Sequence, residues 1–198
     1  VLPGLLAALF CSVSALGAET PPNASSYPHI VFIFADDMGY GDIQRYNPYS
    51  RIPTPNLNRL VDEGMQFTDA HTSSSVCTPS RYGLLTGRYC WRTRLKRGVL
   101  FPPHDKPLIE KQRLTLPAML RQKGYHTACI GKWHLGIDWA RDEKGQVDFN
   151  QPFEFGPTDV GFDEFFGIAA SLDMIPYMYY RNHEPVHRAT ETQPRQDF

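Results

Sequence analysis

The stretch from Ser75 to Arg88 most constrains what this chain can fold into. It places Cys77, Pro79 and Arg81 close together and then continues into an apolar segment. Pro79 suits the first turn of a helix, and Gly87 suits the position just past a helix end. We therefore expect Cys77 at a helix N-terminus, where backbone N–H groups and the helix dipole favour an anion. Arg81 would share its helix face, because residues four apart are neighbours, so the stretch predicts a site for an oxyanion ester.

The rest of the chain alternates short apolar runs, typical of buried strands, with amphipathic segments that carry helix caps. This alternation predicts an α/β fold with a largely parallel central sheet flanked by helices. The long basic connection at residues 89–113 is expected to be a functional loop or an excursion to another surface. The expected strands are residues 29–34, 65–70, 125–130 and 161–168, and the expected helices are residues 54–64, 77–86 and 115–123.

Polar residues follow two of these expected strands, where sites lie in open α/β sheets. Asp36 and Asp37 follow the first strand, and their mutual repulsion would be relieved by a hard cation, Ca²⁺ or Mg²⁺. The alternative to a metal site is a turn in which one aspartate caps a helix.

Lys132 and His134 follow another expected strand and lie on either side of Trp133, so in an extended turn both would point to one side. They could bind an anionic oxygen and transfer a proton, or be a surface lysine and a packed histidine.

Taken together, these motifs resemble the type I sulfatases of the alkaline phosphatase superfamily. Cys77-x-Pro79-x-Arg81 with residues 84–88 is similar to the first signature of that family, and residues 124–134 are similar to the second. Residues 34–39 match its metal-binding Asp-Asp. The resemblance extends to about residue 168 and implies an arylsulfatase-like enzyme that hydrolyses sulfate esters.

The resemblance also implies catalytic roles. Cys77 would be converted by a maturation enzyme to Cα-formylglycine, whose hydrate attacks sulfur. Arg81 would hold the hydrate and offset negative charge. Lys132 would bind sulfate, and His134 would aid its release as the partner of a formylglycine hydroxyl.

A metal and a substrate contact complete the implied site. Asp36 and Asp37, together with the modified Cys77, would bind Ca²⁺, with Mg²⁺ less favoured. Ser171 is a candidate for contact with the substrate, with Asp173 as its alternative; both could be plain loop. The remaining histidines are expected to be structural or exposed (His71, His104, His126, His183 and His187).

Two other functions remain open on the sequence. The same nucleophile and fold could serve a phosphodiester or phosphonate ester hydrolase. The third hypothesis is a non-catalytic relic that binds sulfated glycans. The mildly favoured substrate is a sulfated carbohydrate, by analogy alone.

The chain is expected to be exported and to hold part of a catalytic domain. Residues 1–18 are apolar and end in small residues, as in a truncated secretory signal, with an uncleaved anchor as the alternative. Residues 19–28 would be a linker, and residues 29–198 the N-terminal part of the catalytic domain. No later segment predicts a membrane span. The expected location is periplasmic or extracellular, or lysosomal or secretory in a eukaryote. Because further metal ligands and a C-terminal domain of the family are not found, the fragment alone should be inactive and marginally stable.

Charge and cysteine content bear on the partners. The formal charge of −1, with basic residues spread along the chain, argues against nucleic acid as the main partner. The run from Arg88 to Arg97 is the exception, and would be either a solvated basic loop or a contact for an anionic substrate. Outside the expected signal there are three cysteines, and an odd number leaves one reactive or modified thiol. A bridge between Cys90 and Cys129 is conceivable.

Overall fold

A computed structural model describes residues 27–190, so the expected signal and most of the expected linker lie outside the described residues. Within the described part, no helix has the length and apolar character needed to cross a bilayer. The helices are α1 (Pro55–Glu63), α2 (Cys77–Thr86) and α3 (Leu116–Gln122), with short 3-10 turns η2 (Tyr40–Asp42), η3 (Cys90–Arg92) and η4 (Pro157–Val160); the strands are β1 (Ala128–Lys132), β2 (Glu164–Ile168), β3 (Tyr179–Arg181) and β4 (Glu184–Pro185).

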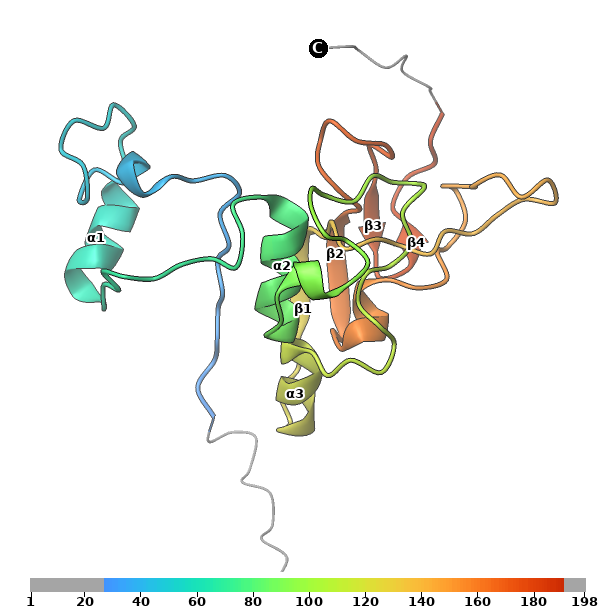
Figure 1. Cartoon of the computed structure of the whole chain (residues 1–198), viewed down its shortest axis with the longest axis horizontal. Coiled ribbons are helices and arrows are strands. Elements are labelled where there is room, and N and C mark those ends of the chain that lie inside the picture. The colour runs from blue at the N-terminus through green and yellow to red at the C-terminus, as the bar shows by residue number, and fades with distance from the viewer. Residues whose placement is uncertain (1–26, 191–198) are drawn as a thin grey trace, which may run out of the picture.

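The four strands form one sheet in the order β1-β2-β3-β4 (Figure 1). β1 and β2 are parallel, with Ala128 opposite Glu164 and Lys132 opposite Ile168. The other two pairings are antiparallel. β3 and β4 are joined by a tight turn in which Asn182 adopts a φ of 54°. The predicted α/β class is confirmed, while the described sheet is mixed and contains one parallel pairing.

The first expected strand is wrong, and so is the strand expected at residues 65–70. Residues 29–34 form no ladder hydrogen bonds, and Val31 and Ile33 are each 84% exposed. Their start lies near β1, since the Tyr125 hydroxyl donates to the Pro28 carbonyl oxygen at 3.2 Å. Apolar, β-branched composition makes a segment suitable for a sheet, but a strand also needs a neighbour that satisfies its backbone groups. Both segments lack such a neighbour among the described residues.

The three expected helices are confirmed, and their boundaries follow from their caps. Thr54 precedes α1, and Gly64 follows it. α2 begins at Cys77 and is closed by Gly87, which adopts the left-handed conformation that favours glycine at this position. The Thr115 hydroxyl caps α3 by accepting a hydrogen bond from the Ala118 N–H at 3.3 Å. α1 buries none of its residues and lies at one end of the molecule, away from the sheet (Figure 1).

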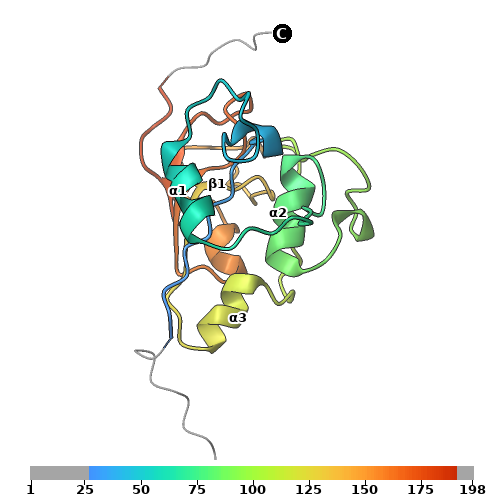
Figure 2. The same cartoon turned by 90° about the vertical axis from the view of Figure 1, so that its left-hand side faces the viewer.

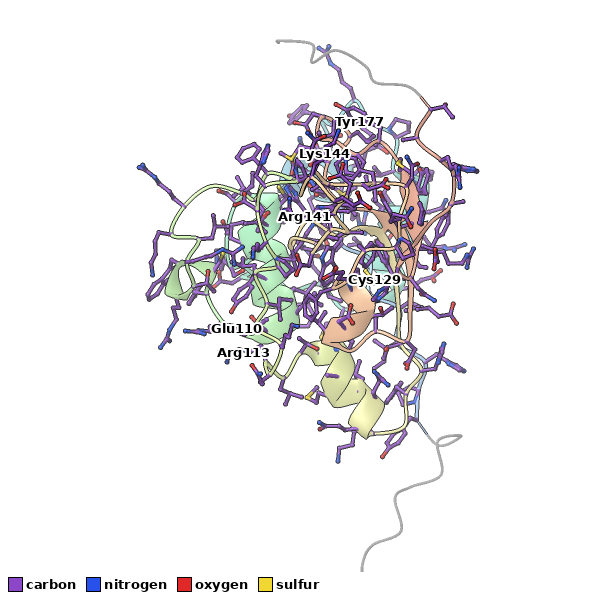
Figure 3. The ribbon with its side chains drawn as sticks, turned by 90° about the vertical axis from the view of Figure 1, so that its right-hand side faces the viewer. Glu110, Arg113, Cys129, Arg141, Lys144 and Tyr177 are labelled. Carbon is purple, nitrogen blue, oxygen red and sulfur yellow. The ribbon has the colours of Figure 1, made fainter. Side chains whose placement is uncertain are left out.

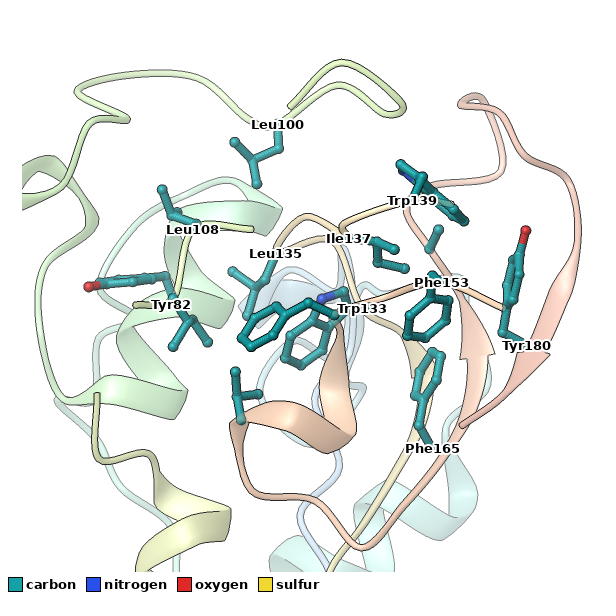
Figure 4. Packing of buried hydrophobic residues seen from close by; sticks show 14 of the residues in the cluster. Tyr82, Leu100, Leu108, Trp133, Leu135, Ile137, Trp139, Phe153, Phe165 and Tyr180 are labelled. Carbon is teal, nitrogen blue, oxygen red and sulfur yellow. The ribbon is translucent and has the colours of Figure 1, made fainter. Parts of the chain in front are cut away.

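The hydrophobic core lies between α2, the sheet and the long connections (Figure 4). Residues 89–113 and 137–160, although mostly irregular, supply many of its side chains. Trp139 is the centre of an aromatic group: its ring meets that of Phe149 edge-on at 5.0 Å, and that of Phe153 at 6.2 Å. Such pairs each stabilise a fold by about 0.5–1.5 kcal/mol beyond their buried area. Both long connections are therefore packed into the hydrophobic core.

Cys90 and Cys129 are both free thiols, so the conceivable bridge between them is not present. Cys90 is the buried first residue of η3, and its Sγ lies 3.7 Å from the Leu95 carbonyl oxygen. Cys129 sits in β1 and packs against the core (Figure 3), where burial raises the pKa of its thiol to about 11. Each cysteine thus behaves as a small core residue.

Candidate active site

The N-terminus of α2 carries the cysteine singled out by the sequence. Cys77 is the first helical residue and is partly accessible to solvent. The preceding loop is held against the helix by the Ser80 hydroxyl, which lies 2.7 Å from the Ser74 carbonyl oxygen and 2.8 Å from that of Val76. A Cβ on Gly83 would lie 2.0 Å from Ser73 Oγ, so only glycine allows this close approach. The cysteine is therefore held at the end of a packed helix.

Three predicted residues from distant parts of the chain meet beside this helix. Asp36 Oδ2 lies 2.9 Å from Arg81 Nη2 and 2.8 Å from Lys132 Nζ. Arg81 Nη1 also donates to the Lys132 carbonyl oxygen at 2.5 Å. The three side chains are only 15–17% exposed. We call Asp36, Arg81 and Lys132 the carboxyl-end cluster, because it lies where β1 ends.

The carboxyl-end cluster controls the charge of both aspartates. Burial raises the pKa of Asp36, but hydrogen bonds from Lys132 and Arg81 outweigh it and hold the pKa well below its usual range. The hydrogen bond and negative charge of Asp36 raise the pKa of Asp37. Two carboxyl groups this closely coupled would both be ionised more easily beside a divalent cation.

Glycines allow β1 and β2 to approach closely just before Lys132. A Cβ on Gly167 would lie 1.7 Å from the Gly131 carbonyl oxygen. The pairing continues past the strand end, where the His134 N–H donates to the Ala169 carbonyl oxygen at 2.9 Å. Lys132 and His134 are therefore placed by the sheet itself.

His134 is fully enclosed and is tied to α2 through Thr78. The Thr78 hydroxyl donates to the His134 carbonyl oxygen at 2.9 Å and accepts from the Leu100 N–H at 3.2 Å. The backbone of His134 has a φ of 56°, so it turns here and does not continue the extended turn expected from the sequence. The sequence alone did not indicate a role for Thr78. The one sequence feature that could have suggested it is the position of Thr78 next to Cys77.

The two ring nitrogens of His134 differ. Nε2 lies 2.9 Å from the Leu100 carbonyl oxygen, which can only accept, so Nε2 carries the proton. Nδ1 therefore has the lone pair of the neutral ring, and it has no hydrogen-bond partner within residues 27–190. Burial lowers the pKa of His134, and the hydrogen bond to Leu100 offsets this only in part. The neutral ring is favoured, with Nδ1 as the atom that can accept a proton.

Ser171 and Asp173 lie at the same end of the sheet but do not join the carboxyl-end cluster. They follow β2, whose last residue, Ile168, is paired with Lys132. Ser171 is half-buried and accepts a hydrogen bond from the Met174 N–H through its carbonyl oxygen at 3.1 Å. No side-chain contact within the described residues assigns either one to the site.

The aspartate pair fits part of a calcium site. Carboxylate oxygens are the donors that Ca²⁺ prefers, but the ion takes six to eight oxygen ligands. Across residues 27–190, no group of three or more His, Cys, Asp or Glu side chains is arranged to hold a metal ion. Asp36 and Asp37 therefore fit this cation chemically, and the described residues supply only part of its shell.

A second charged cluster, which the sequence interpretation did not anticipate, lies at the opposite end of β1 and β2. Arg121 Nε lies 3.0 Å from Asp163 Oδ1, and His126 Nε2 lies 3.0 Å from Glu164 Oε1. The Thr127 N–H donates to Asp163 at 2.8 Å. We call Arg121, His126, Asp163 and Glu164 the amino-end cluster. Its hydrogen bonds fasten α3 and the start of β1 to the start of β2.

Comparison with known sequences identifies one family. A family profile described as Sulfatase matches residues 28–193. The chain is 37% identical over 182 residues to N-acetylgalactosamine-6-O-sulfatase of Bacteroides thetaiotaomicron, covering 92% of this chain and 34% of that protein. It is 38% identical over 168 residues to human arylsulfatase A, covering 85% of this chain and 29% of that protein. The chain thus spans about a third of the length of these curated relatives.

Solved structures agree with these sequence relatives. One, from work titled as the metabolism of multiple glycosaminoglycans by Bacteroides thetaiotaomicron, has a TM-score of 0.71 and 38% identity. It covers 80% of this chain and 32% of the compared chain. A structure titled Ps i-CgsB has a TM-score of 0.58 at 24% identity, covers 82% and 37% of the two chains, and supports the fold alone.

Proposed function

The chain belongs to the sulfatase family, and from this membership we propose that the protein hydrolyses sulfate esters with a nucleophile made from Cys77. The observation that carries the proposal is the carboxyl-end cluster beside the helix that begins at Cys77. Arg81 lies one turn after Cys77 on the same helix face, and it meets Lys132 through a carbonyl and through Asp36. Two cations and a helix N-terminus beside one residue suit an ester that carries negative charge.

We propose formylglycine at position 77, formed from the cysteine by a maturation enzyme. Formylglycine would supply a hydrated aldehyde, with one hydroxyl to attack sulfur and displace the alcohol and a second hydroxyl whose deprotonation would expel sulfate and restore the aldehyde. Arg81 would hold the hydrate, since its guanidinium is fixed on two sides by the Lys132 carbonyl and Asp36. Lys132 Nζ would bind a sulfate oxygen. Both cations offset charge that builds up on the oxygens in the transition state.

His134 would handle the proton in this scheme. With Nε2 donating to the Leu100 carbonyl, Nδ1 is the nitrogen that can accept a proton when sulfate leaves. The Thr78 hydroxyl keeps this histidine at a fixed position relative to the first turn of α2. A buried base kept neutral by its surroundings suits proton transfer near neutral pH.

Asp36 and Asp37 would bind Ca²⁺, with residue 77 as a further ligand and with ligands beyond the described residues. The cation would polarise the sulfate group when bound. We further propose a sulfated carbohydrate as substrate, in line with the name of the Bacteroides thetaiotaomicron relative, and Ser171 as a contact for it. Export to a compartment outside the cytoplasm is part of this proposal.

Two measurements on the full-length protein test the proposal. Mass spectrometry of the peptide containing Cys77, from a host with the maturation enzyme, should show loss of the thiol and gain of an aldehyde. Turnover of a small aryl sulfate should exceed turnover of the matching phosphodiester and vanish in Cys77→Ala. A strong preference for the phosphodiester would replace the sulfatase assignment. If Cys77 is unmodified and neither ester is turned over, the protein would instead be a non-catalytic binding protein.

A further inference from the structure

The connection after α2 carries a charge pattern unlike the rest of the chain. Residues 88–104 contain five basic side chains and no acidic one, whereas the remainder has 15 basic and 21 acidic side chains. Arg88 is the one of the five with an ion-pair partner in the described part of the chain, Glu110 at 3.5 Å. The positive charge of Arg92, Lys96 and Arg97 is thus left without a carboxylate partner there.

Two exposed aromatic rings lie within this positive segment. Tyr89 and Trp91 are 54% and 58% exposed, and their rings stack with centroids 6.1 Å apart and planes 19° apart. The guanidinium of Arg92 lies 5.9 Å from the centre of the Trp91 ring. The Lys96 ammonium donates to the Trp91 carbonyl oxygen at 3.0 Å. We call Tyr89, Trp91, Arg92, Lys96 and Arg97 the η3 platform.

The backbone beneath the η3 platform is fixed. Cys90 and Thr93 point inward and are buried. The Thr93 N–H and hydroxyl both donate to the Cys90 carbonyl oxygen, at 2.8 and 2.7 Å, and the Leu95 N–H donates to the Thr93 hydroxyl at 3.1 Å. Because the inward residues are held, the alternate residues present their rings outward on a rigid turn. Binding to such a surface loses little conformational entropy.

The η3 platform is separate from the proposed active site. It follows the C-terminus of α2, whereas Cys77 is at the N-terminus, and a ten-residue helix is about 15 Å long. In Figure 2 this turn lies at the outer edge of the molecule, beyond α2. A ligand that contacts both places must be an extended chain and not a single sugar.

We propose that the η3 platform is a second binding surface for a sulfated polysaccharide chain. The aliphatic C–H face of a pyranose ring would stack on Trp91 and Tyr89, while sulfate groups would pair with Arg92, Lys96 and Arg97. This inference rests on the proposed function for its substrate class. Single-stranded nucleic acid also combines stacking with phosphate charge, but its binding sites are generally broader basic grooves than these three cations.

Binding is tested with full-length protein carrying Cys77→Ala, so that the polymer stays intact. Chondroitin 6-sulfate, the same polymer after chemical desulfation, and a single-stranded DNA of equal charge are the probes. Trp91→Ala should weaken binding of the sulfated chain roughly tenfold, as expected for loss of one stacked ring. Tyr49→Ala removes a ring that is 90% exposed elsewhere on the surface, and it should leave affinity unchanged.

Three results would overturn the inference: equal affinity of the Trp91→Ala variant and its parent, equal binding of the desulfated chain, or DNA binding as tight and as dependent on Trp91. Turnover separates this inference from the proposed function. With Cys77 intact, Trp91→Ala should raise KM for the polymer and leave kcat for a small aryl sulfate unchanged. Failure of the wild-type protein to cleave the aryl sulfate would refute the proposed function, while the binding measurements would still decide the role of the η3 platform.

Discussion

The two charged clusters at the opposite ends of β1 and β2 have similar distances and different surroundings. The carboxyl-end cluster joins its charges at 2.8 and 2.9 Å, with side chains that are 15–17% exposed. The amino-end cluster has two pairs at 3.0 Å, but three of its four side chains are 49–69% exposed. Water and salt screen exposed pairs, whereas a pair that water reaches poorly interacts more strongly and is costly to disrupt.

The clusters also differ in how they are assembled and in their net charge. The carboxyl-end cluster takes its residues from three distant segments and sets two cations on one carboxylate. The amino-end cluster lies around the starts of two paired strands and contains two carboxylates. The carboxyl-end cluster has a net positive charge, which suits an anionic ligand. The amino-end cluster mainly holds neighbouring elements together. This difference predicts that matched substitutions will affect activity at one end and only stability at the other.

The largest effect is expected from Arg81→Met in the full-length enzyme. The variant keeps much of the aliphatic packing but removes the donors to Asp36 and to the Lys132 carbonyl. If Arg81 stabilises charge in the transition state, kcat/KM for an aryl sulfate should fall about 10²- to 10³-fold, as for loss of one such donor. Steady-state kinetics measure this, with far-ultraviolet circular dichroism to confirm the fold.

The matched control is Arg121→Met in the amino-end cluster, which removes the pair with Asp163 at the other end of the sheet. Its kcat/KM should stay within about twofold of the wild type, since surface changes away from a site are usually small. Equal losses in both variants would abolish the distinction between the two clusters.

A smaller effect is expected from Thr78→Val, which tests how the carboxyl end is built. Valine has the same shape but removes the bond to the His134 carbonyl and leaves the buried Leu100 N–H without its acceptor. We expect a loss of about 1–3 kcal/mol in the free energy of unfolding, the cost of an unsatisfied buried group. Urea unfolding measures this loss, and Thr78→Ser, which keeps the hydroxyl, should recover most of it. Without such recovery the hydroxyl would not be the cause.

The pH dependence of stability should also report the burial of His134 at the carboxyl end. Burial lowers the pKa of His134, so the unfolded chain binds its proton more readily than the folded one. Stability should therefore decrease as pH falls below about 6.5, with a slope of up to about 1.4 kcal/mol per pH unit from this residue. Above that pH its contribution is constant. His134→Gln should flatten the profile just below about pH 6.5, and an unchanged slope would mean that another group produces it.

Part of the carboxyl end could be predicted from local signals in the sequence, although the strand expected before Asp36 and Asp37 is wrong. Pro79 and Gly87 mark both ends of α2, so the cysteine and the arginine one turn later could be placed on one face. The parallel-sheet rule then placed Lys132 and His134 together after β1. These inferences needed only local signals and one topological rule.

The remaining features depend on contacts between distant segments. The exposure of residues 29–34 could not be predicted, because apolar composition carries no information on whether a neighbouring strand is present. The role of Thr78 depends on its position between His134 and Leu100, which are far away in sequence. The amino-end cluster likewise joins residues on α3, before β1 and at the start of β2. Such networks have no periodic pattern and appear only after folding.

The smallest effect is expected at the more exposed amino-end cluster. Arg121→Ala removes a pair with Asp163 in which the arginine side chain is half exposed. Burial raises the pKa of Asp163, but hydrogen bonds from Thr127 and the charge of Arg121 outweigh it and lower the pKa below its ordinary value. Because Thr127 remains, the variant should lose only about 0.2–1 kcal/mol in urea unfolding, and less at 1 M salt. A loss comparable with that of Thr78→Val, insensitive to salt, would mean that the amino-end cluster is as integral to the fold as the carboxyl end.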